Sequence, residues 1–224
     1  LNSGKIEKIP KEIGKLTNLK NLSLYGNKIT NVPNEIGSLT KLEQLDLAFN
    51  QLKSLPKVIG NLKNLNENSL TEVPETFKNL TKLSSLFISN NPLSSFPEAI
   101  LNLPNIERLF LSFCGLTEIP KGIENIKSLN ELSIDNNSIS SIPKEIGKLT
   151  NLNKLSLQNN SISAVPSEIK NLKNLTNLSI SNNPLKSFPV AILNLTKLEE
   201  LFLINCQLTE IPKEIENLKS LIEL

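Results

Sequence analysis

The feature that most constrains the fold of this 224-residue chain is a regular spacing of prolines. A proline that follows an aliphatic or Phe residue returns every 23 residues, with one interval of 18. These prolines are Pro10, Pro33, Pro56, Pro74, Pro97, Pro120, Pro143, Pro166, Pro189 and Pro212. A period of about 20–29 residues is typical of solenoids, in which short structural units stack in a row. The sequence therefore predicts a repeat array.

The repeat that ends at Pro166 shows what each unit contains. The alternation LSL at residues 155–157 predicts a short strand with both leucines pointing inward. Pro166, with Glu168 two residues later, suits the first turn of a short helical segment. Asn160, which we call the ladder Asn of its repeat, lies where the chain leaves the strand. We expect its amide to bond backbone groups of neighbouring turns.

The stretch IPKEIGKLTNLNKLSLQNN, residues 142–160, carries this pattern in full. With ten tandem matches of this kind, the chain resembles the leucine-rich repeat family over essentially its whole length. The resemblance implies an α/β solenoid of horseshoe shape, with parallel strands on the concave face and short helical or 3-10 segments on the convex face. It also implies a non-catalytic module that binds a protein partner on the concave face. We expect residues 1–224 to form one solenoid of about ten repeats, with both ends in mid-repeat.

The 23-residue LPxEIGxLxxL pattern further resembles spirochaetal repeat proteins of the leptospira type. This resemblance implies a bacterial protein that is secreted or displayed at the cell surface and contacts a host. Intracellular scaffold proteins share the period, so a cytoplasmic location is the alternative. Another alternative is the substrate-recognition part of a larger effector of the ubiquitin-ligase type. A third is a structural protein that associates end to end through apolar ends, at Leu1, Leu221 and Leu224.

The interval of 18 residues belongs to an anomalous short repeat at residues 57–74. Leu62 and Leu65 match positions before the strand, and Asn68 matches the ladder Asn after it. This alignment leaves the strand itself missing between Glu67 and Asn68. We interpret the loss as five residues absent from the sequence as written, which predicts a Cα separation there far above the roughly 3.8 Å of a trans peptide. The alternative is a degenerate repeat that forms a kink.

Composition excludes several kinds of chemistry. The chain has no His, so no Ser-His-Asp, Cys-His or His-containing zinc pattern is possible. Its 8 glycines are scattered and form no phosphate-binding loop. A net charge of +2 gives no electrostatic reason to bind nucleic acid, and no apolar run is long enough to insert into a membrane. We therefore expect no enzyme activity, no cofactor and no metal.

Two cysteines, Cys114 and Cys206, replace the ladder Asn in repeats four turns apart. Strands spaced by about 4.7–4.9 Å put these cysteines roughly 19 Å from each other, which is too far for a disulfide. We expect both thiols to be free and buried, with a reactive thiol as the alternative.

The aromatic residues divide into two groups by their position in the repeat. Phe77, Phe96 and Phe188 occupy inward positions, so we predict that they belong to the core. The other five Phe and the only Tyr occupy outward positions on the predicted concave face: Tyr25, Phe49, Phe87, Phe110, Phe113 and Phe202. Nothing about folding requires aromatic side chains there.

Phe87, Phe110 and Phe113 lie on two adjacent repeats, and Arg108 belongs to the second of them. We predict that Arg108 and the six outward aromatic residues bind a protein partner, because exposed aromatic side chains are typical anchors of interfaces. Arg108 would then orient the partner from the margin. The alternative is that the rings lie flat on their neighbours and cover the sheet.

Overall fold

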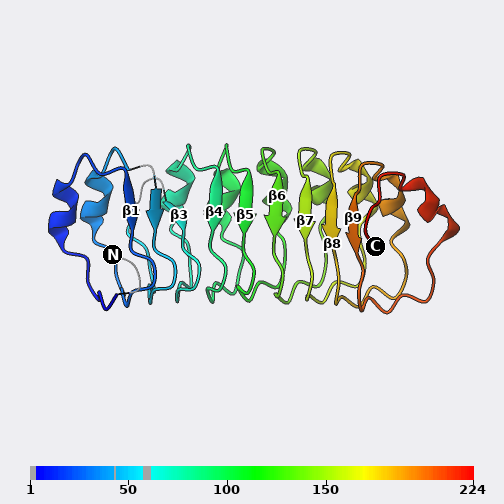
Figure 1. Cartoon of the computed structure of the whole chain (residues 1–224), viewed down its shortest axis with the longest axis horizontal. Coiled ribbons are helices and arrows are strands. Elements are labelled where there is room, and N and C mark those ends of the chain that lie inside the picture. The colour runs from blue at the N-terminus through cyan, green and yellow to red at the C-terminus, as the bar shows by residue number, and fades with distance from the viewer. Residues whose placement is uncertain (1–3, 43, 58–61) are drawn as a thin grey trace.

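The computed structural model describes residues 4–42, 44–57 and 62–224, and the side chains of all of these except residues 62 and 63. In this part of the chain, short strands form one parallel sheet in the order of the sequence (Figure 1). They are β1 (Asn21–Ser23), β2 (Gln44–Asp46), β3 (Leu62–Asn64), β4 (Ser85–Phe87), β5 (Arg108–Phe110), β6 (Glu131–Ser133), β7 (Lys154–Ser156), β8 (Asn177–Ser179) and β9 (Glu200–Phe202). The predicted parallel solenoid is confirmed.

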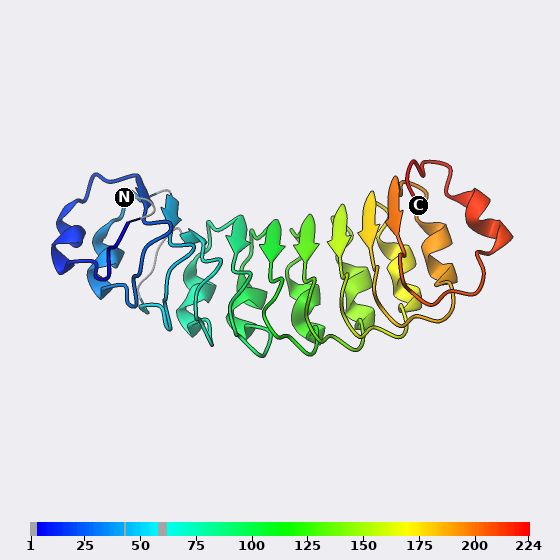
Figure 2. The same cartoon turned by 60° about the horizontal axis from the view of Figure 1, so that its bottom comes forward.

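Short 3-10 segments return the chain on the other side of the sheet. They are η1 (Lys11–Lys15), η2 (Asn34–Ser38), η3 (Glu75–Asn79), η4 (Glu98–Asn102), η5 (Lys121–Asn125), η6 (Lys144–Lys148), η7 (Ser167–Asn171), η8 (Val190–Asn194) and η9 (Lys213–Asn217). Figure 2 shows the strands along the inner side of a shallow arc and these segments along its outer side. Among the residues described, no helix is long and apolar enough to cross a membrane.

A proline directly precedes each described 3-10 segment and explains where it begins. The φ of these prolines lies between −59° and −77°, the range that the pyrrolidine ring imposes. The proline carbonyl accepts the first hydrogen bond of the segment, as in the 3.1 Å bond from Ile146 N–H to Pro143 O. Because proline has no N–H, it leaves no unpaired donor at the start of the turn.

One hydrophobic core runs along the solenoid between the sheet and the 3-10 segments. The inward strand residues Leu86, Leu109 and Leu132 are at most 1% exposed. Phe77, Phe96 and Phe188 belong to the same core, as predicted, and the largest exposure among them is 8%. Every turn therefore shares its apolar side chains with the turns above and below it, which a single repeat could not do alone.

The ladder Asn residues join neighbouring turns, as predicted. Asn91 Nδ2 donates to Ile88 O in its own turn at 2.8 Å and to Leu65 O in the preceding turn at 2.9 Å. Its Oδ1 accepts from Leu70 N–H at 3.0 Å. These bonds satisfy backbone groups that are out of reach of the strands, so the Asn is part of the fold rather than a candidate for binding.

The glycine of the EIG motif is explained by the close approach of successive 3-10 segments. A Cβ at Gly14 would lie 2.6 Å from the backbone oxygen of Glu35 in the next turn. A Cβ at Gly147 would meet the backbone oxygen of Glu168 in the same way. Real Cβ atoms do not approach an oxygen so closely, so glycine lets the turns stack without separating.

The short repeat differs from the prediction, because its strand is present. β3 pairs with its neighbours through Asn64, which lies opposite Asp46 on β2 and Phe87 on β4. The register between β2 and β3 shifts between Leu45 and Asp46, as in a β-bulge. Asn64 follows its partner Asp46 by 18 residues, and Phe87 follows Asn64 by 23, so the shortening lies between β2 and β3 and not in the strand.

The predicted break between Glu67 and Asn68 is also wrong. Glu67 has a φ of 53°, close to the 57° of Asn90 at the same position in the next turn. Asn68 Nδ2 donates to Leu65 O and to Leu47 O, both at 3.0 Å. These are the bonds of an intact ladder turn, so the described residues fit the alternative, a degenerate repeat.

Candidate functional site

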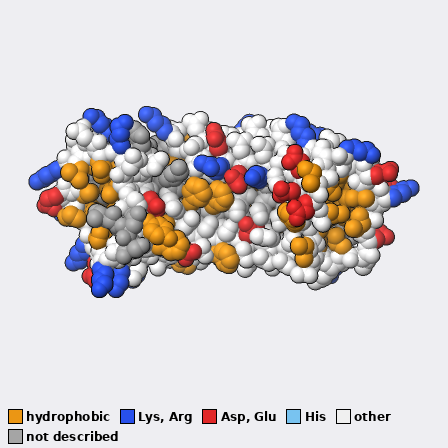
Figure 3. Space-filling view, viewed as in Figure 1, with side chains coloured by type: hydrophobic (Ala, Val, Ile, Leu, Met, Phe, Trp, Pro, Cys, Tyr) orange, Lys and Arg blue, Asp and Glu red, His pale blue; other side chains and the backbone are white. Residues whose placement is uncertain are grey.

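Phe87 and Phe110 form an aromatic pair in the middle of the strand face. They are register partners on β4 and β5. Their ring centroids lie 4.7 Å apart, and the ring planes differ by 12°, so the rings are stacked. Both side chains are partly exposed, and neither belongs to the hydrophobic core. Figure 3 shows hydrophobic side chains gathered over β4 and β5 on this face.

Arg108 lies at the edge of this pair, where the sequence predicted a charge. Its guanidinium carbon is 6.0 Å from the centroid of the Phe87 ring. Its Nε donates to Ser85 Oγ at 3.0 Å, which fixes the side chain along β4. A cation over a ring is attracted by the negative charge of the ring face. Phe87, Phe110 and Arg108 therefore form one unit, which we call the aromatic anchor.

Tyr25 and Phe49 form a second aromatic contact nearer the N-terminal end. Their ring centroids are 4.9 Å apart, with the planes tilted by 53°. These two pairs are the only ring contacts in the part of the chain that the structure describes. Phe113, which is 56% exposed, and Phe202 on β9 therefore stand apart from both pairs. The structure brings together some of the predicted binding residues but does not bring them all into one cluster.

A polar network beside the aromatic anchor was not predicted from the sequence. Asp135 is only 7% exposed, and its Oδ2 accepts from Ser133 Oγ at 2.7 Å. Its Oδ1 accepts from Ser156 Oγ and, at 3.0 Å, from Gln158 N–H. Ser133 is the register partner of Phe110, so the network borders the stacked rings. The signal was a carboxylate in a column of otherwise neutral outward positions.

This network changes how the serines of the strand face are interpreted. The repeated serines at the third position of β6, β7 and β8 look equivalent in the sequence. Ser133 and Ser156 donate to a buried carboxylate, and hydrogen bonds to a charged group contribute about 1.5–3 kcal/mol. Ser179, at the same position of β8, lies outside this network and is a better control for an unimportant surface position.

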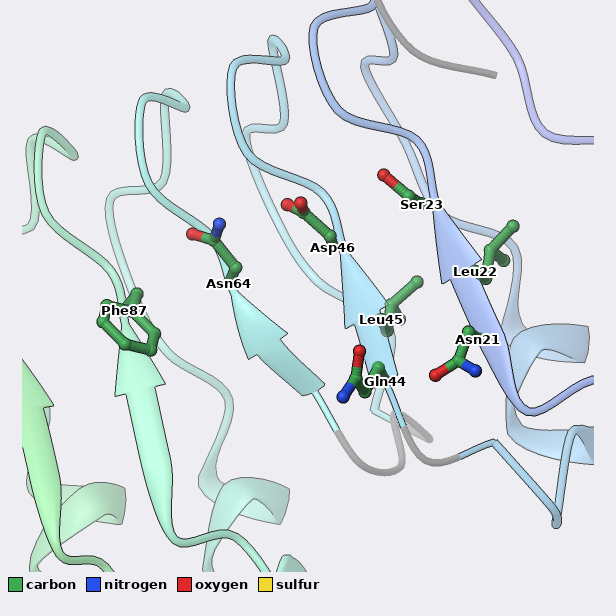
Figure 4. A pocket seen from close by; sticks show the side chains of 8 residues that line it. All are labelled: Asn21, Leu22, Ser23, Gln44, Leu45, Asp46, Asn64 and Phe87. Carbon is green, nitrogen blue, oxygen red and sulfur yellow. The ribbon is translucent and has the colours of Figure 1, made fainter.

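A hollow of about 340 Å³ opens on the same face over β1, β2 and β3. Figure 4 shows Asp46 and Asn64 pointing toward this space, with Phe87 beyond them. The remaining lining residues are Asn21, Leu22, Ser23, Gln44 and Leu45. Asp46 Oδ1 accepts from Ala48 N–H at 3.0 Å, so its carboxylate is held in place. The lining of the hollow therefore mixes polar side chains with Leu22, Leu45 and the ring of Phe87.

The outward positions of the sheet are more acidic than the protein as a whole. These positions are the first and third residues of each strand and the two residues before each ladder position. Their described side chains include five acidic residues and two basic ones: Asp46, Glu67, Glu131, Asp135, Glu200, Arg108 and Lys154. The described side chains at these positions thus carry a net charge of −3, whereas the whole chain carries +2.

The two cysteines are free and buried, as predicted. Burial raises the pKa of the Cys114 thiol to about 11, although hydrogen bonds to the backbone of Asn91 and Asn90 oppose the shift. Burial also raises the pKa of Cys206. Both thiols stay protonated at neutral pH and are poor nucleophiles. In the described part of the chain, no group of three or more Cys, Asp or Glu residues could hold a metal ion.

Comparison with known proteins agrees with this architecture. Residues 1–70, 64–159 and 144–224 match the family model described as a leucine-rich repeat region. A leucine-rich repeat protein of Leptospira interrogans is 36% identical, with a TM-score of 0.64, and the match covers 95% of this chain and 67% of that chain. No curated protein matches the chain.

Two receptors of known structure are also similar. The plant peptide hormone receptor RGFR1, solved in complex with RGF2, is 30% identical, with a TM-score of 0.76 and coverage of 100% of this chain and 46% of that chain. A TDR receptor is 30% identical, with a TM-score of 0.77 and coverage of 95% and 44%. The chain thus spans less than half the length of either receptor. Since the family model matches segments that together span the chain and the fold is shared, the chain belongs to the leucine-rich repeat proteins.

Proposed function

We propose that this protein is a non-catalytic recognition module and that its strand face binds a protein or peptide partner through the aromatic anchor. The observation that carries the proposal is the stacked pair of Phe87 and Phe110 outside the core, with Arg108 over its edge. Folding does not require these rings at outward positions, since Ser occupies the same position in β6, β7 and β8. Aromatic and Arg side chains at the centre of a surface are the usual anchors of protein interfaces.

Similar structures support a polypeptide as the partner. The receptor RGFR1 is in complex with RGF2, and the receptor PEPR1, which is 26% identical to this chain, is paired with AtPEP1. An extended segment laid across the strands of this chain could contact β4, β5 and β6 in succession, because neighbouring strands are about 4.7–4.9 Å apart. The stacked rings would then contact its apolar side chains, and Arg108 would orient a polar group at the margin.

We also propose that the protein acts at the surface of a bacterium or is secreted from it. The support is the similarity to the Leptospira interrogans protein across 95% of this chain. Protease treatment of intact cells of the source organism tests this: a surface protein is digested without lysis, and a cytoplasmic protein is digested only after lysis.

Binding can be tested with a displayed library of random peptides as the probe. A side chain at an interface hot spot contributes about 2 kcal/mol or more, so Phe110→Ala should weaken the selected peptides by roughly thirtyfold. Ser179→Ala is the matched control and should leave their affinity within about twofold. If the two variants bind the selected peptides equally well, the rings only cover the sheet and the proposed anchor is wrong.

A further inference from the structure

One position in every described turn, the residue just before the ladder position, has a left-handed backbone. Its φ lies between 53° and 67° throughout. Asn and Gly tolerate this conformation best, because Asn can hydrogen-bond locally and Gly has no Cβ. Five turns accordingly place Asn here, at Asn90, Asn136, Asn159, Asn182 and Asn205.

The Asn side chains of this row also bond to one another along the solenoid. Asn159 Nδ2 donates to Asn136 Oδ1 at 3.0 Å. Asn205 Nδ2 donates to Asn182 Oδ1 at 2.9 Å. In the C-terminal half these Asn residues therefore stabilise the fold in two ways. They tolerate the left-handed backbone, and their side chains hydrogen-bond to one another.

Three residues of this row are neither Asn nor Gly: Glu67 and two bulky aromatic residues, Phe49 and Phe113. Each Phe has a φ of 55°, which is strained for a bulky side chain. Burial does not compensate for the strain, since Phe49 is 47% exposed and Phe113 is 56% exposed. Neither ring belongs to the hydrophobic core. Backbone strain that is not offset by burial or core packing is typical of functional positions.

The charges of the same face indicate what these rings contact. Outward positions carry a net charge of −3 in a chain whose overall charge is +2, so a cationic partner is attracted and a nucleic acid is repelled. An exposed Phe ring also attracts cations through its face. Arg108 over the ring of Phe87 shows this contact within the molecule itself.

We propose that Phe49 and Phe113 are binding residues kept at a cost in stability, and that with the acidic strand face they bind a Lys- and Arg-rich polypeptide segment that carries an apolar side chain. This inference rests on the proposed function and names the chemistry of the partner. Phe49 and Phe113 belong to turns three repeats apart along the row, on either side of the aromatic anchor's first strand, β4. A segment that runs across the strands from β2 to β5 would meet both.

The displayed peptide library tests this inference directly. Peptides selected on the whole chain should be enriched in Lys, Arg and apolar residues, and their affinity should fall as the salt concentration rises. Phe113→Asn should weaken them by about tenfold or more, because an exposed ring is lost from the interface. The same change should leave the melting temperature unchanged or raise it by about 2–4 °C, since Asn suits the left-handed backbone.

Asn90→Phe, the reverse change in the neighbouring turn, is the matched control and should lower the melting temperature. Two results would overturn the inference: selection of acidic peptides, or unchanged affinity in Phe113→Asn. If Phe110→Ala still weakens binding while Phe113→Asn does not, the aromatic anchor stands and only this inference fails. A fall of the melting temperature in Phe113→Asn with unchanged affinity would show that the ring supports the fold.

Discussion

Leu109 and Phe110 are consecutive residues of β5 that point to opposite faces of the sheet. Substituting each in turn therefore distinguishes a residue needed for folding from a residue of the outward surface. Leu109 is fully buried, and replacing such a leucine by alanine costs about 2–5 kcal/mol of the free energy of unfolding. Phe110 lies outside the core and loses chiefly its stack on Phe87. An aromatic pair contributes about 0.5–1.5 kcal/mol beyond its area. Phe110→Ala should therefore destabilise the protein much less than Leu109→Ala.

Urea unfolding followed by circular dichroism measures both changes. Since the slope m depends on the surface exposed, it should stay constant, and the midpoint should fall most for Leu109→Ala. In a protein that already carries Phe110→Ala, Phe87→Ala should cause little further loss of stability, because the stack is already lost. This non-additivity measures the coupling of the two rings. Equal losses of stability in Leu109→Ala and Phe110→Ala would contradict this assignment of the two faces, because the outward ring would then be part of the core.

Three further changes test other parts of the structure. Asn137→Ala should cost about 1–3 kcal/mol, since the N–H groups of Cys114 and Leu116 both lose their acceptor, and urea unfolding checks this. Gly147→Ala should cost about 1–3 kcal/mol in the same assay, because its Cβ would meet Glu168 O, whereas a small effect would mean that the turns can separate. Stability should fall by roughly 2 kcal/mol as the pH rises from 9.0 to about 11, because the Cys114 thiol ionises above pH 9.0 in the unfolded chain but only near pH 11 in the folded protein. Cys114→Ala should remove that part of the pH dependence, and an unchanged slope would contradict it.

The fold could be predicted because every repeat carries the same residue types at the same spacing. Inward Leu and Ile, the proline before each 3-10 segment and the ladder Asn recur at fixed spacing, so each repeat confirms the others. The exception was the short repeat, where the template placed the loss in the strand. Pairing with β2 and β4 keeps β3 in the sheet, so the apolar template misplaced the loss, which lies between β2 and β3.

The candidate site was only partly predictable. Outward aromatic positions follow from strand alternation, which is why the pair of Phe87 and Phe110 was expected. The network around Asp135 was not, because its members come from different repeats and look like ordinary polar surface in the sequence. The strain at Phe49 and Phe113 depends on a backbone angle that the apolar pattern does not reveal.

The most direct test of the account is oxidative footprinting by hydroxyl radicals of the protein alone and with a selected peptide, because this method reports on individual Phe side chains. If the strand face is the binding surface, oxidation of Phe87, Phe110 and Phe113 should fall when the peptide binds. Oxidation of Val190, which is 65% exposed at the start of η8 on the opposite side, should not change. Protection of Val190 with no protection of the three rings would contradict the claim that the strand face is the binding surface.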